Sequence, residues 1–123
     1  MTPCILALDL GTQTGWALAG SDGLVDSGTV SFAPRPGERK GARFVRFRTW
    51  LNDLKAAHED ISEVFYERVN RHTGVQAAHV YGGLLATLMT WAEHHNIDYD
   101  GVGVQAIKKF ATGKGNAKKE QII

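Results

Sequence analysis

The sequence predicts a mixed α/β fold, with one sheet that combines an antiparallel three-strand meander with parallel strands and is flanked by helices. Short apolar runs separated by glycine-containing turns open the chain, and a segment with apolar residues at helical spacing follows them. Strand-like and helix-like segments then alternate along the rest of the sequence. Strands joined by tight turns pair antiparallel, whereas strands joined through a helix pair in parallel, so one sheet should contain both kinds of pairing.

The meander begins with an uninterrupted apolar run that carries Asp9 near its end. Such a run is typical of a strand that is buried on both faces at the centre of a sheet. A Gly/Thr turn leads from it into a second strand over 15–19. A turn over 20–23 then leads into a third strand over 24–32.

The rest of the chain is predicted to complete one domain over 1–123. Its elements are a helix over 38–58, a strand over 61–66 followed by Glu67, a helix over 76–95, a strand over 98–104, a helix over 105–111 and the start of a helix over 117–123. The first helix should place its arginines opposite an apolar face made of Phe44, Phe47, Leu51 and Leu54. The apolar face of the long second helix should consist of Ala77, Tyr81, Leu84, Leu85, Leu88 and Ala92.

Composition sets the class of protein. With 123 residues, 43% of them hydrophobic, the chain is expected to form one soluble domain, and the lone Cys4 cannot form an internal disulfide. No stretch has the length of a membrane span, so we expect a cytoplasmic protein with no membrane partner. The net charge of +1 conceals two basic blocks, whose members are Arg35, Arg39, Lys40, Arg43, Arg46 and Arg48 in one and Lys108, Lys109, Lys114, Lys118 and Lys119 in the other.

Two carboxylates are the first candidates for chemistry. Asp9 in a buried strand is costly, so it either holds a metal or ligand or accepts hydrogen bonds from the following turn. The fourth strand can lie beside the first, which would bring Glu67 next to Asp9 and require a shared proton or a cation. Hard oxygen ligands suit Mg²⁺ or Mn²⁺, and nearby basic residues point to phosphodiester cleavage. The alternative is that Glu67 ends its strand in water and pairs with Arg68.

Three segments resemble RuvC-type Holliday junction resolvases, especially the phage-borne branch. They are LDLGTQTGWA at 8–17, FYE at 65–67 and QAIKKFATGKGNAKK at 105–119, in the same order as in that family. The resemblance implies an RNase H-like fold, a homodimer, divalent-metal catalysis and paired nicking of four-way DNA junctions. Its phage-borne members imply a bacterial or phage-infected cell as the setting.

The resemblance also implies roles for individual residues. Asp9 and Glu67 match the first two metal-binding carboxylates, and Lys108 and Lys119 match lysines that lie near the DNA phosphates or the active site. Together with the two basic blocks, this makes a larger set of cations candidates for phosphate contact. The set is Arg43, Arg46, Arg71, Lys108, Lys109, Lys114, Lys118 and Lys119. His72, in the loop after Glu67, is a candidate for orienting a water, or else an exposed loop histidine.

The sequence departs from the family pattern in two ways. The family carries its last two carboxylates on a helix near the C-terminus, whereas this sequence ends at Ile123 with Glu120 as the only acid of its tail. The expectation is therefore a domain without that helix, supplying half of the metal site. The family's cellular enzymes also place an aromatic wedge after the strand-ending Glu, where this chain reads RVNRHTG, so substrates are expected to include branched DNA beyond the four-way junction.

Three other functions are compatible with these residues. The missing carboxylates favour a non-catalytic protein that binds branched DNA. Relatives of the YqgF type, which act on RNA, have a similar size and pattern. The Asp-Leu-Gly-Thr start also resembles the phosphate-binding motif of the actin and sugar-kinase superfamily, which would make the chain an ATP-binding module, although no second Gly-rich phosphate motif follows.

Overall fold

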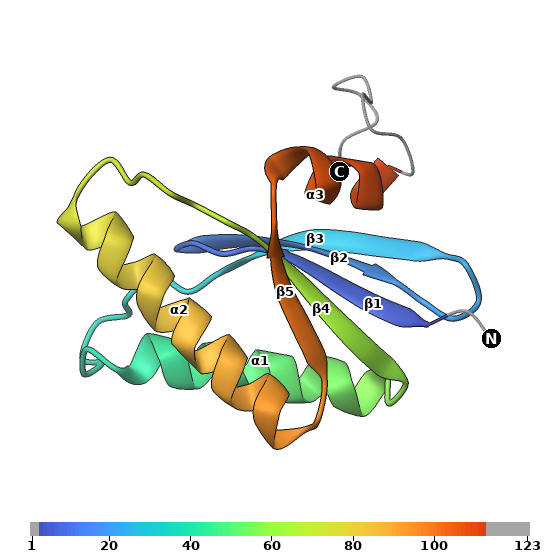
Figure 1. Cartoon of the computed structure of the whole chain (residues 1–123). Helices are drawn as coiled ribbons and strands as arrows, with labels where there is room; N and C mark the ends of the chain where they lie inside the picture. Colours follow the sequence, from blue (N-terminus) through green and yellow to red (C-terminus); the bar gives the residue numbers. More distant parts are fainter. Residues whose placement is uncertain (1–2, 113–123) are drawn as a thin grey trace.

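The computed structural model describes residues 3–112, apart from the side chains of residues 108 and 110–112, and its centre is a five-stranded sheet (Figure 1). The strands are β1 (Cys4–Asp9), β2 (Gln13–Ala19), β3 (Val25–Ser31), β4 (Ile61–Glu67) and β5 (Asp98–Val102). The helices are α1 (Ala42–Ala57), α2 (Val75–His94) and α3 (Val104–Thr112). The predicted helix over 117–123 lies outside the described residues.

The sheet has the order β3-β2-β1-β4-β5. Strands β1, β2 and β3 form the antiparallel meander, and β4 pairs in parallel with both β1 and β5. The predicted mixed sheet is therefore confirmed, with β1 at its centre. The parallel strands and β3 all end at one edge of the sheet, which we call the carboxyl edge.

The helices form two layers. Helices α1 and α2 cover one face of the sheet, and α3 lies on the other face, where it contacts β1 and β4 (Figure 1). The main core lies under α1 and α2 because alternate residues of β1 and β4 point towards them. Its fully buried side chains include Leu6, Leu8, Phe47, Leu51, Val64, Leu84 and Leu88. No helix in residues 3–112 combines the length and apolarity that a membrane crossing requires.

The predicted helix faces are largely correct. Phe47 and Leu51 of α1 are buried, with Phe44 and Leu54 packed beside them. In α2 the prediction was wrong for Ala77, which is exposed in the first turn, beyond the part of the helix that lies over the sheet. Trp91 joins the buried face instead, and its indole N–H donates to Asn52 Oδ1 at 2.9 Å.

Helix α1 begins at Ala42 rather than at residue 38 because the preceding residues form a loop with its own contacts. Gly37 in this loop adopts a left-handed conformation with φ of 82°. The Glu38 carboxylate accepts a hydrogen bond from the Arg35 backbone N–H at 2.8 Å, and it also binds Arg46. Glu38 therefore fastens the loop to α1 instead of opening the helix.

Candidate metal centre at the carboxyl edge of the sheet

Asp9 and Glu67 end the two neighbouring parallel strands at the centre of the sheet. The last pair in the register of β1 with β4 is Leu8 with Tyr66, so the two acids lie one residue further along each strand. Leu8 and Tyr66 pack in the core under α1 and α2. Because side chains alternate, Asp9 and Glu67 both point to the α3 side of the sheet, on strands about 4.8 Å apart.

The surroundings of Asp9 differ from the expectation. Asp9 is exposed rather than buried, because it is the last residue of β1 and the strand is covered only up to Leu8. The turn after it is closed by Thr14, whose hydroxyl donates to Gly11 O at 2.7 Å and accepts from Gly11 N–H at 3.4 Å. No residue in 3–112 donates a hydrogen bond to the Asp9 carboxylate, so the turn-capping interpretation of Asp9 is wrong.

Glycine at position 15 gives the Asp9 carboxylate space. Gly15 pairs with Asp9 across β1 and β2, and a Cβ atom at this position would stand 3.7 Å from Asp9 Cβ. Paired residues on antiparallel strands point to the same face, so a longer side chain here would lie alongside the carboxylate. The sheet thus leaves the β2 side of Asp9 open.

Tyr81 of α2 links this edge of the sheet to the helical layer. Its hydroxyl donates to the Glu67 backbone carbonyl at 2.9 Å and accepts from Val69 N–H at 3.4 Å. Burial is the main cause that raises the pKa of Tyr81, and the negative charges of Glu67 and Asp9 add to the increase. Both carboxylates are therefore within electrostatic range of one half-buried hydroxyl. The ring of His72 packs on Tyr81 with centroids 5.1 Å apart, so His72 is a half-buried packing residue.

Sequence reasoning missed Tyr81 as part of the site. It assigned the residue only to the apolar face of its helix, where the aromatic ring does lie. The available signal was chemical: a tyrosine that packs into an interior needs a partner for its hydroxyl. The carboxyl edge of the neighbouring strand offers that partner.

The carboxylate pair provides the donor set that Mg²⁺ or Mn²⁺ prefers. All of its ligand atoms are hard oxygens, and Mg²⁺ commonly binds through one or two carboxylates while it keeps several waters. The exposed position of Asp9 leaves room for such waters. Residues 3–112 contain no cluster of three or more His, Cys, Asp or Glu side chains that could hold a metal, so the pair is the candidate within this part of the chain.

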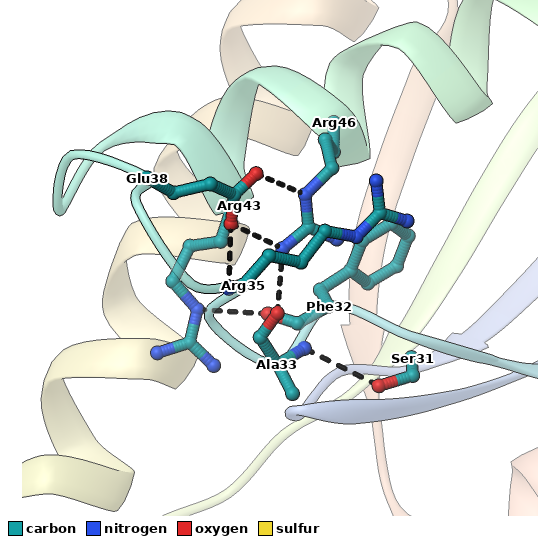
Figure 2. A network of polar contacts seen from close by, with 7 residues as sticks. All are labelled: Ser31, Phe32, Ala33, Arg35, Glu38, Arg43 and Arg46. Atoms are coloured by element: carbon teal, nitrogen blue, oxygen red, sulfur yellow. Dashed lines mark hydrogen bonds and ion pairs between the residues drawn. The ribbon is translucent and has the colours of Figure 1, made fainter.

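Arg43 and Arg46 do not lie on the outer side of α1, which corrects the prediction for these two residues. Figure 2 shows both guanidinium groups directed at the loop before the helix. Arg46 binds the Glu38 carboxylate at 2.9 and 3.1 Å and donates to Ala33 O at 2.6 Å. Arg43 donates to Phe32 O and to Thr12 Oγ1, each at 3.0 Å. Arg43 thereby connects α1 to the turn that follows Asp9.

The other predicted cationic residues are distributed over several segments. Arg71 is exposed in the loop between β4 and α2, and Lys109 is exposed on α3. Lys108 also lies on α3, but its side chain is outside the described part of the structure. Lys114, Lys118 and Lys119 lie outside the described residues altogether.

Solved structures share this architecture. Thermus thermophilus RuvC in complex with a Holliday junction substrate matches with a TM-score of 0.72 and 17% identity, over 98% of this chain and 74% of that chain. T. thermophilus RuvC by itself matches with a TM-score of 0.65 and 19% identity, over 96% and 74%. The yeast mitochondrial Holliday junction resolvase matches with a TM-score of 0.56 and 16% identity, over 89% and 53%.

The chain therefore has the RuvC-type, RNase H-like fold that its sequence predicts, with a mixed five-stranded sheet between helices. No family model matches the sequence, and a search of curated proteins finds no match either.

Proposed function

We propose that this protein is a metal-dependent, structure-selective endonuclease that nicks Holliday junctions or other branched DNA, in recombination, repair or phage DNA processing. The observation that carries the proposal is the placement of Asp9 and Glu67 on one face of the sheet, at the ends of adjacent parallel strands. The fold is that of structures described as Holliday junction resolvases, one of them in complex with a junction substrate. Two negatively charged side chains at the ends of adjacent strands repel each other, and a divalent cation bound between them would remove this repulsion.

In this proposal Asp9 and Glu67 hold Mg²⁺ or Mn²⁺, which would activate a water and stabilise the leaving oxygen of a phosphodiester. Tyr81 fixes the backbone at Glu67 through its bond to the carbonyl oxygen, and so it fixes the point from which the carboxylate extends. Lys108 and Lys119 are assigned to the phosphates or the reacting group because they match the lysines of the resembled family. The remaining proposed phosphate contacts are Arg43, Arg46, Arg71, Lys109, Lys114 and Lys118.

The proposed partner protein is a second copy of the chain. A four-way junction has two equivalent strands to cut, and a twofold symmetric dimer presents one carboxylate pair to each strand. The proposed location is the cytoplasm of a bacterial or phage-infected cell, where such junctions form.

The test is cleavage of a synthetic four-way junction by the full-length protein in the presence of Mg²⁺. We expect symmetric nicks, and we expect Asp9→Asn and Glu67→Gln each to lower the rate by at least about 100-fold, because each removes a charged metal ligand. Asp26→Asn is the matched control. Asp26 is an exposed acid of β3 whose carboxylate binds only its neighbour Ser27 N–H within the described residues, so cleavage should be unchanged.

Other outcomes would favour other functions. Undiminished cleavage by Asp9→Asn would contradict the proposal. Binding of the junction without nicking, even with Mn²⁺, would favour a non-catalytic DNA-binding protein, a function consistent with the two-carboxylate site. Cleavage of RNA but not of DNA would favour an activity of the YqgF type, and tight ATP binding without any junction preference would favour the ATP-binding module.

A further inference from the structure

A basic pocket lies between the loop that precedes α1 and the first turns of α2. Its volume is about 510 Å³, within the range of pockets that hold small ligands. Arg39, Lys40 and Arg43 line it from the α1 side, and Gln76 and His79 line it from α2. Phe44, Val80 and Gly83 contribute apolar surface, so the pocket combines a cationic side with an apolar one.

The pocket has an excess of positive charge. Among the described residues, Glu38 is the only acid that lines it, and its carboxylate forms an ion pair with Arg46 at 2.9 Å. The hydrogen bond from Arg46 lowers the pKa of Glu38, so the carboxylate is ionised at neutral pH and its charge is balanced by Arg46. Within the described residues, no carboxylate forms an ion pair with Arg39, Lys40 or Arg43. Three cations are therefore available to an anionic ligand.

Arg43 is held in place for such a ligand. A guanidinium has five N–H donors, and Arg43 uses one on Phe32 O and one on Thr12 Oγ1. These bonds fix the plane of the group and leave other donors for a second acceptor. A rigid guanidinium with several free N–H groups binds the paired oxygens of a phosphate well.

The pocket and the carboxylate pair lie at the same edge of the sheet. Thr12, to which Arg43 donates, is in the turn that directly follows the strand ending at Asp9. His79 lies in α2 just before Tyr81, whose hydroxyl binds the Glu67 carbonyl. The carboxylates point to the α3 side and the pocket opens on the α1 and α2 side. A strand that crosses the carboxyl edge can therefore contact both.

We propose that this pocket binds a backbone phosphate of the DNA strand next to the phosphodiester held at Asp9 and Glu67. The phosphate lies against Arg39, Lys40 and Arg43, and the attached sugar packs on Phe44 and Val80. This inference rests on the proposed nuclease function, and it assigns a ligand to Arg39, Lys40, Gln76 and His79, which have no role in the metal centre.

The experiment measures binding of a labelled four-way junction to the metal-free protein by fluorescence anisotropy, over a series of salt concentrations. Arg39→Ala and Lys40→Ala should each weaken binding by about three- to tenfold and reduce the slope of log affinity against log salt by about one, because each removes one phosphate contact. Arg48→Ala is the matched control. Arg48 is an exposed arginine of α1 that does not line the pocket, so the slope should stay at the wild-type value.

A second pair of variants adds a charge instead of removing one. Gln76→Glu places a carboxylate in the pocket with almost no change in side-chain size, and we expect it to weaken junction binding by about tenfold. Ala86→Glu adds the same charge at an exposed position of α2 away from the pocket, and it should leave affinity close to that of the wild type. All of the substituted positions are exposed, so folding should be preserved, and circular dichroism checks this.

The outcomes separate this inference from the proposed function. If Asp9→Asn abolishes cleavage while the Arg39, Lys40 and Gln76 variants bind like Arg48→Ala, the nuclease proposal stands and the pocket assignment is wrong. If the wild type binds no DNA, both are wrong. Titration with thymidine monophosphate tests the other source of a phosphate. Loss of affinity for this nucleotide in the pocket variants, with junction binding intact, would assign the pocket to a free nucleotide and overturn the DNA assignment.

Discussion

At the scale of single residues, Tyr81 determines how the Glu67 strand end is held. Its hydroxyl donates to the carbonyl oxygen of Glu67, the last residue of β4, and accepts from the backbone N–H of Val69, two residues further along the chain. The carboxylate of Glu67 extends from this same backbone. A small shift of the strand end therefore moves a proposed metal ligand, although Tyr81 itself contacts neither the metal nor the DNA in the proposal.

We predict that Tyr81→Phe lowers the free energy of unfolding by about 1 kcal/mol and the rate of junction cleavage by about tenfold. The ring packing is kept, and only the hydroxyl is lost. Tyr99→Phe is the matched control, because its hydroxyl donates to Glu93 Oε2 at 2.8 Å in an exposed pair. Urea unfolding and cleavage assays distinguish the two positions. Equal cleavage by both variants would contradict a positioning role for Tyr81.

The pH dependence of the stability lost in Tyr81→Phe follows from the direction in which folding changes the pKa of Tyr81. Burial raises the pKa of Tyr81 above its ordinary value of 10.0, so the folded protein keeps the hydroxyl protonated. The stability that depends on this proton is fully present below pH 10.0 and is lost as the pH rises through the higher folded value. The difference between wild type and Tyr81→Phe should accordingly be constant from neutral pH to about 9.

The residue scale also shows what alternation along a strand can and cannot predict. The adjacency of Asp9 and Glu67 followed from strand order and the ends of two apolar runs, and the register agrees with it. The exposure of Asp9 did not follow, because a run of apolar residues does not reveal where the covering helices stop. Arg43 and Arg46 were predicted to lie opposite the apolar face of the helix, because helical spacing ignores the loop before α1, which folds back onto both side chains.

At the scale of secondary-structure elements, the contact between α1 and α2 depends on one glycine. A Cβ atom at Gly83 would come within 2.5 Å of the Phe44 ring, whereas a Cβ atom at Gly82 would meet open space. Gly83 therefore receives a side chain of α1, and Gly82 has no such role.

We predict opposite effects of alanine at these two positions. Gly82→Ala should stabilise the protein by up to about 1 kcal/mol, because alanine favours the helix and nothing obstructs it. Gly83→Ala should destabilise it by about 1 to 3 kcal/mol despite the same gain in helix propensity, because the Phe44 ring, which is half-buried against the core, would have to move away. Thermal unfolding of both variants measures the difference. Stabilisation by Gly83→Ala would mean that α1 and α2 separate easily.

The elements themselves were predictable because each has a clear local signal. Every strand and helix in residues 3–112 was anticipated, and strand β4 lies within one residue of its predicted bounds. The predicted start of α1 was wrong because the Glu38 carboxylate binds Arg35 and Arg46 in a loop before the helix. The spacing of apolar residues does not reveal such contacts. The predicted burial of Ala77 was wrong because the first turn of α2 extends past the sheet. How far a helix extends past its sheet depends on tertiary structure, which helical spacing does not reveal.

At the scale of the whole molecule, the connections of the chain gather its chemistry at one edge of the sheet. Strands β1 and β4 end there with Asp9 and Glu67, β3 ends there before the loop that leads to α1, and α2 begins there. Parallel pairing makes this arrangement unavoidable, because parallel strands present their carboxyl ends together. A four-way junction has two strands to cut, and a second copy of the chain is proposed to extend the surface over both of them.

We predict that catalytically inactive subunits interfere with wild-type subunits when the junction is in excess. In a plasmid that extrudes a four-way junction, a dimer with two intact sites cuts both strands and yields linear DNA. Mixing equal amounts of wild type and Asp9→Asn gives roughly half mixed dimers, each with one intact site, so nicked circles should accumulate in place of linear product. Independent monomers would behave differently, because inactive subunits then occupy other DNA molecules and leave the ratio of linear to nicked product unchanged.

Asp26→Asn in place of Asp9→Asn is the control for this mixing experiment, since it keeps both sites intact. Sedimentation of the complex should show two chains for each junction, and a single chain with an unchanged product ratio would contradict the dimer.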